Sequence, residues 1–94
     1  MATFVLTPRP SKNSTGPADM APWTAWFEQL GASVVDHGKP VFERGAVGNC
    51  GTDTVLGGYF LLTADNLEAA VALARGCPTI GQGGGIEVGE LGDL

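Results

Sequence analysis

The stretch spanning residues 56–91 constrains the fold most, because it reads as strand, helix and strand with a start or stop signal at each junction. Residues 59–63 are aromatic and aliphatic apart from a final threonine, which is typical of a buried strand. Successive side chains of a strand point to opposite faces, and Phe60 and Leu62 share one of them. Both faces are apolar, so we expect something to cover each side.

A helix is predicted for residues 65–75. Asp65 is followed three residues later by Glu68, a pair that resembles a capping box at a helix start. Gly76, in a left-handed backbone conformation, and then Pro78 would end the helix. Four residues recur at helical spacing and form one apolar stripe: Leu67, Ala70, Val71 and Ala74.

A glycine-rich run at residues 81–85 precedes the last predicted strand, residues 85–91. Phosphate-binding loops follow a strand and open a helix, where free amides meet the anion. This run follows a helix and opens a strand, so we interpret it as a flexible connection.

The first half of the chain predicts a second set of strand, helix and strand. Residues 3–7 form the first strand, and residues 33–37 form the next one, which Gly38 and Pro40 should end. Residues 41–55 have no clean period and are either a long loop or a loose hairpin.

The helix between these strands should start at Asp19 as N-cap, with Pro22 in its first turn, and stop at Gly31. Its apolar stripe consists of Met20, Trp23, Phe27 and Leu30. Trp26 lies off the centre of that stripe. It is therefore either a core residue or the edge of a groove or interface.

The composition fits one globular domain covering residues 1–94, with 44% hydrophobic and 16% charged residues. A net charge of −5 with five basic residues argues against nucleic acid as a partner. No apolar run approaches the roughly 20 residues that cross a bilayer, so no membrane association is expected. The first residues lack a signal-peptide pattern, and we expect a cytoplasmic location. One histidine and two scattered cysteines favour neither a metal site nor a disulfide, and no cofactor is expected.

The order of elements predicts an α+β fold of the ferredoxin-like βαββαβ type, an antiparallel sheet with two helices on one face. The other face would then be apolar and uncovered, formed by Phe60, Leu62 and Val5 or by the residues opposite them. A second copy of the chain would cover it, so the sequence predicts a homodimer that forms through the sheet face.

Two parts of the chain resemble the YCII-related family, also called DGPF-domain proteins. They are GGYFLLTADNLEAAVALARGCP followed by GGGIEVGEL, and WTAWFEQLGASVVDHGKPV. The resemblance implies a dimeric α+β barrel, and many members have no assigned activity. A catalytic histidine that some members carry on the first helix falls at or near Trp23 here. The Asp-Gly-Pro-Phe motif is replaced by Glu43, Arg44 and Gly45, so no catalytic role is carried over.

His37 is the candidate general base, because histidine is the side-chain type that normally changes charge near neutral pH. Asp36 is adjacent, but neighbours on a strand point to opposite faces, which argues against a dyad. Glu43 in the following loop is the preferred carboxylate partner. The alternative is a purely structural histidine.

Three residues are candidates for binding a substrate. Arg44 could orient an anionic group through bidentate hydrogen bonds from its guanidinium, or could be a solvated surface arginine. Tyr59 and Trp26 offer aromatic walls, with core packing as the alternative for both.

The sequence is compatible with two functions. The first is a homodimer that binds a small, partly apolar molecule in a cleft between helices and sheet, with cofactor-free acid–base chemistry of the isomerase or lyase kind if it turns the molecule over. The second is a non-catalytic accessory module that acts on a protein partner.

Overall fold

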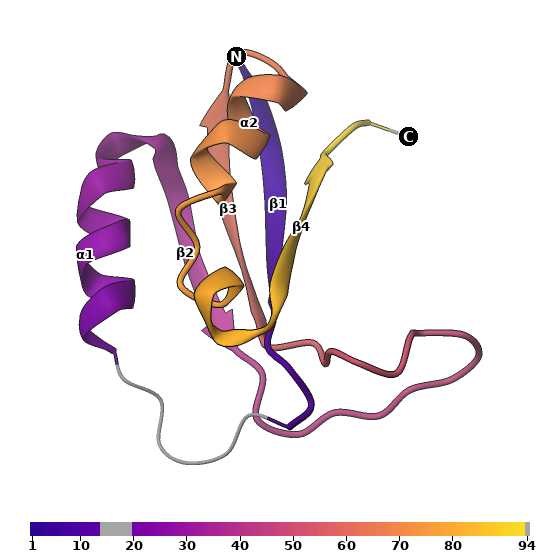
Figure 1. Cartoon of the computed structure of the whole chain (residues 1–94). Helices are drawn as coiled ribbons and strands as arrows, with labels where there is room; N and C mark the ends of the chain where they lie inside the picture. The colour runs from indigo at the N-terminus through magenta and orange to yellow at the C-terminus, as the bar shows by residue number, and fades with distance from the viewer. Residues whose placement is uncertain (14–19, 94) are drawn as a thin grey trace.

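The computed structural model describes residues 1–13 and 20–93 and has a four-stranded antiparallel sheet with two helices (Figure 1). The strands lie in the order β2-β3-β1-β4, and every neighbouring pair is antiparallel. The predicted α+β class is therefore confirmed. Along the chain the elements are β1 (Ala2–Arg9), α1 (Ala21–Leu30), the short 3-10 turn η1 (Gly31–Ser33), β2 (Val34–Pro40), β3 (Gly58–Ala64), α2 (Leu67–Ala74), the 3-10 turn η2 (Ile80–Gln82) and β4 (Gly85–Glu90).

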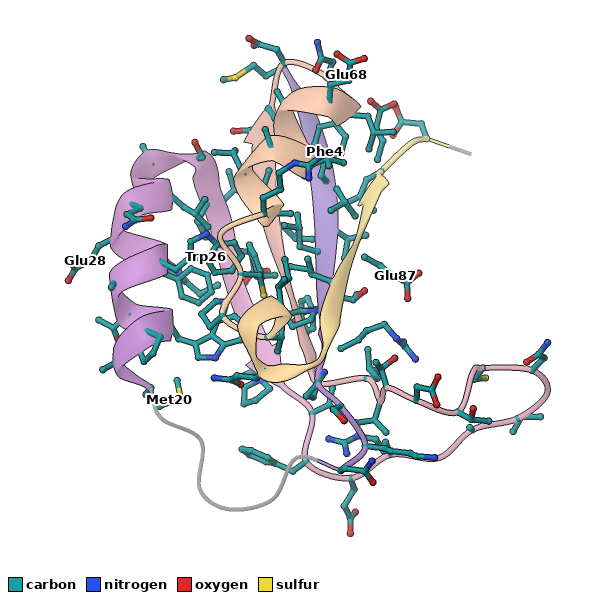
Figure 2. The ribbon with its side chains drawn as sticks, in the orientation of Figure 1. Phe4, Met20, Trp26, Glu28, Glu68 and Glu87 are labelled. Carbon is teal, nitrogen blue, oxygen red and sulfur yellow. The ribbon has the colours of Figure 1, made fainter. Side chains whose placement is uncertain are left out.

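The hydrophobic core lies between the helices and one face of the two central strands. Phe4 and Leu6 of β1 pair with Leu62 and Phe60 of β3, and all four side chains are almost completely buried. Figure 2 shows Trp26 directed from α1 toward this face. The helices add further buried residues to the same cluster: Trp26 and Leu30 from α1, and Ala70 and Ala74 from α2.

The face of the sheet away from the helices, here called the open face, has a different membership from the one predicted. Val5 pairs with Leu61, so it belongs with Leu61 and not with Phe60 and Leu62. Val5 and Leu61 are both half-buried, and Tyr59 is 41% exposed. The grouping of Val5 with Phe60 and Leu62 is wrong because the face of Val5 depends on the pairing register, which the sequence of a single strand does not specify.

Strand β2 continues through the two residues that were expected to end it. Gly38 takes a φ of 61°, within an irregular stretch where β2 shifts its pairing with β3. Pro40 pairs with Gly58 and is tolerated because β2 is an edge strand of the sheet. Glycine and proline here shape the strand without terminating it.

The ends of the helices differ in detail from the prediction. Asn66, and not Asp65, caps α2, since its side-chain oxygen accepts a hydrogen bond of 2.8 Å from the amide of Ala69. Gly76 does not take the left-handed conformation. It makes room for the core instead, because a Cβ there would come within 2.7 Å of Nε1 of Trp26.

The start of α1 agrees only in part with the expectation. Pro22 lies in the first turn, as predicted, and Met20 occupies the N-cap position without a side-chain cap. The predicted cap, Asp19, lies outside the described residues. Gly31 ends α1 with a φ of 55°, as expected.

Residues 41–57 form the long connection of the β2–β3 hairpin and extend away from the sheet (Figure 1). No strand forms within them, so the long-loop alternative describes this segment. Its base is held by backbone hydrogen bonds of 3.0 Å from Val41 to Gly57 and from Val55 to Pro10. Arg9 adds a side-chain bond of 3.1 Å from Nε to Oγ1 of Thr54.

We expect Asn66→Ala to lower the free energy of unfolding by about 1 kcal/mol, because it removes the N-cap acceptor. Asp65→Ala is the control, and it should change the stability by less than about 0.5 kcal/mol. Urea unfolding followed by circular dichroism measures both. A larger loss for Asp65→Ala than for Asn66→Ala would contradict the capping assignment.

Candidate functional site

An open groove of about 820 Å³ lies at the end of the sheet where β1 and β2 finish and β3 begins. Helix α1 and turn η2 border it together with the base of the long loop. The residues that line it come from five separate segments of the chain: Pro8, Pro10, Ser11, Lys12, Met20, Trp23, Phe27, His37, Lys39, Pro40, Phe42, Arg44, Val55, Gly57, Gly58, Tyr59, Phe60, Thr79 and Gln82. The groove is thus built by tertiary structure and not by one motif.

His37 reaches the groove because β2 carries two extra residues relative to β3. Val34 pairs with Leu62 but Asp36 already pairs with Leu61, and a second shift follows between Asp36 and Lys39. Such bulges redirect side chains. The ring of His37 lies 5.4 Å, centre to centre, from that of Phe27, on the side of the sheet that α1 covers.

Asp36 and His37 do not form a dyad. Oδ1 of Asp36 accepts a hydrogen bond of 2.8 Å from the amide of Gly38 and so stabilises the irregular backbone of its own strand. The sequence argument against this pair is in agreement with the structure. In the chain segments that the structure describes, the one aromatic contact of His37 is with Phe27.

Of the two locations left open for Trp26, the structure shows the core, and it places Trp23 at the groove. Trp26 is only 4% exposed and packs edge-on against Phe60 at 5.5 Å, so it is a core residue that does not line the groove. Trp23 is half-buried and lines the groove together with Phe27, with ring centres 6.1 Å apart. The apolar residues of α1 share one face, and the helix is rotated so that Trp26 and Leu30 are buried while Trp23 and Phe27 lie partly buried at the edge of that face.

Glu43 does not join His37. It lines a neighbouring shallow hollow with Phe42, Arg44 and Gly45, outside the groove. Within the described ranges no hydrogen bond or ion pair connects Glu43 with His37. The structure thus places Glu43 beside the groove and without a contact to His37, and their partnership stays a prediction.

Arg44 and Tyr59 are brought to the groove. Nη2 of Arg44 donates a hydrogen bond of 2.9 Å to the backbone oxygen of Val41, which fixes the guanidinium near the base of the loop. Tyr59 lies beside buried Phe60 at the start of β3, and its 41% exposure shows that core packing does not account for it.

Sequence reasoning missed five polar residues at the groove, Ser11 among them, because only the fold brings their segments together. Lys12, Lys39 and Gln82 are exposed, whereas Thr79 is buried. Oγ1 of Thr79 donates a hydrogen bond of 3.1 Å to the backbone oxygen of Gly85 and lies 2.8 Å from Sγ of Cys77. Thr79 is thereby a structural support of turn η2.

The chain matches no family model, no curated protein and no solved structure. Its function therefore has to be inferred from the groove itself. Among residues 1–13 and 20–93, no helix is long and apolar enough to cross a membrane. The same residues contain no cluster of three or more histidine, cysteine, aspartate or glutamate side chains that could hold a metal ion.

Gly38→Ala should disrupt the redirected part of β2 and lower the free energy of unfolding by more than about 1 kcal/mol. Gly38 has a positive φ, and an added Cβ would overlap the backbone oxygen of Tyr59. Gly45→Ala is the matched control, since a Cβ there meets nothing within 4 Å, and its stability should equal that of the wild type. Urea unfolding gives the stability, and the NMR shifts of the His37 ring protons report the local geometry. Unchanged shifts and stability in Gly38→Ala would refute the assigned role of this glycine.

Proposed function

We propose that the protein binds a small, partly apolar molecule in the groove at the end of its sheet. The observation that carries this proposal is the position of His37, which two bulges turn into a groove walled by Trp23 and Phe27. A concave site with aromatic walls and a few polar groups is the usual form of a small-molecule site. A volume of about 820 Å³ is in the range of such sites.

We further propose that the chain is a ferredoxin-like member of the YCII-related family. The strand order is β2-β3-β1-β4, helix α1 connects β1 to β2, and helix α2 connects β3 to β4. This arrangement supports the βαββαβ connection. The resemblance of residues 23–41, 57–78 and 83–91 to that family supports the assignment independently.

If the bound molecule is also turned over, cofactor-free proton transfer is the chemistry that this site supports, with His37 as the general base. Trp23 and Phe27 would hold an apolar ring beside the imidazole. Isomerisation or elimination would follow from removal of one proton. No carboxylate in the described segments orients His37, so binding is supported more strongly than turnover.

A thermal-shift screen against a metabolite panel tests the site. A ligand at ten times its Kd stabilises the folded state by about 1.4 kcal/mol. That should raise the Tm of a domain of this size by roughly 5–10 °C. His37→Ala should lose this shift, whereas Val35→Ala, a change outside the groove on the same strand, should keep it. Equal shifts in all three proteins would remove His37 from the binding site.

A protein-interaction module is the second candidate function, favoured by the long loop. Phe42 and Val47 are 87% and 95% exposed, which is unusual for large apolar side chains in one loop. A panel with no stabilising ligand, together with a partner that protects this loop from proteolysis, would favour this candidate over the first.

We also propose that two copies associate through the open face, where Val5 and Leu61 are only half-buried. Leu61→Asp should convert a dimer into a folded monomer, since a buried unpaired charge costs several kcal/mol. Ala72→Asp places the same charge on the exposed side of α2 and should leave the dimer intact. Light scattering at micromolar concentration measures both, and a monomeric wild type would refute the proposal.

A further inference from the structure

The positive charges of this acidic chain are gathered at the groove. The chain has five lysine and arginine residues and a net charge of −5. Three of those five line the groove, namely Lys12, Lys39 and Arg44, and His37 lies beside them. No aspartate or glutamate lines the groove among the residues that the structure describes.

Several acidic residues lie away from the groove. Figure 2 shows Glu28 on the outer side of α1, Glu68 at the far end of α2 and Glu87 on the side of the sheet away from the helices. Glu43 borders the adjacent hollow and not the groove. The local charge of the groove is therefore opposite in sign to that of the whole chain.

Among the residues that the structure describes, no carboxylate forms an ion pair with the three cations at the groove. Within residues 1–13 and 20–93 the one ion pair joins Nε of Arg9 to Oε1 of Glu87, at 3.5 Å and away from the groove. Arg44 is held by a backbone oxygen, which leaves its charge uncompensated. Uncompensated cations at a concave site raise the local concentration of an anion.

Two further features determine what kind of anion fits. Trp23 and Phe27 offer aromatic surface to a planar apolar ligand. Met20 and Trp23 place the N-terminal turn of α1 at the same site, and this turn carries no acidic residue, so the positive end of the helix dipole adds to the field of the cations.

We propose that the groove selects aromatic anions, with an aryl carboxylate as the ligand class. This inference rests on the proposed function, because it names the chemistry of the molecule that the same groove binds. The aromatic ring packs beside Trp23 and Phe27. The carboxylate faces Lys12, Lys39 and Arg44, and Arg44 offers the fork of donors that a carboxylate accepts.

The test uses three probes of nearly equal apolar surface: naphthoate, naphthylmethanol and naphthylmethylamine. Calorimetric titration of the full chain at low ionic strength should give naphthoate a Kd about tenfold lower than that of the neutral alcohol. The cationic amine should bind most weakly. In about 1 M salt, where the Debye length is about 3 Å, the preference for naphthoate should largely disappear.

Charge-removing variants locate the effect. Lys12→Gln, Lys39→Gln and Arg44→Gln should each weaken naphthoate about two- to fivefold, the range that exposed ion pairs contribute, and leave the alcohol unchanged. Arg75→Gln removes one positive charge outside the groove and should change neither Kd. Arg44→Lys keeps the charge and should retain most of the affinity. Circular dichroism confirms that each variant is folded.

The outcomes separate this inference from the function on which it rests. Equal affinity for naphthoate and naphthylmethanol, both lost in His37→Ala, would keep the small-molecule groove and overturn the selection for anions. An equal loss of naphthoate in Arg75→Gln and the groove variants would also overturn it, because the effect would then come from net charge. No binding of any of the three probes would overturn both proposals.

Discussion

The contact of Phe60 with two rings of α1 is the interaction on which the rest of the structure depends. Phe60 lies near the start of β3 and packs edge-on against Trp26 at 5.5 Å and Phe27 at 5.1 Å. Aromatic pairs of this kind contribute about 0.5–1.5 kcal/mol each beyond the area that they bury. Because Phe27 also contacts His37, one cluster of rings both holds α1 on the sheet and forms a wall of the groove.

The sequence was sufficient for the order and approximate bounds of the elements, since each strand and helix has its own period and its own end signals. It was not sufficient for features that depend on register. The bulges around Gly38 depend on how β2 pairs with β3, and the burial of Trp26 instead of Trp23 depends on how α1 is rotated. The capping residue of α2 was one position off, because Asp65 and Asn66 can both serve as N-caps.

The candidate site, too, could be predicted from the sequence only in part. His37, Arg44 and Tyr59 were identifiable because their side chains carry distinctive chemistry, and all three line the groove. Lys12 and Lys39 were not, because an isolated lysine is normally a surface residue. The two lysines become candidate ligand-binding residues only because five chain segments converge at one end of the sheet. Loops carried by a rigid core commonly bind ligands.

The irregularity of β2 has a consequence for solubility. An edge strand with a regular row of free amides and carbonyls is a template for pairing with strands of other molecules, which leads to aggregation. β2 is one edge of this sheet, and its two bulges, the charge of Lys39 and the missing amide proton of Pro40 interrupt that row. The backbone distortion that turns His37 into the groove thus also prevents the sheet from growing into a continuous ribbon across this edge.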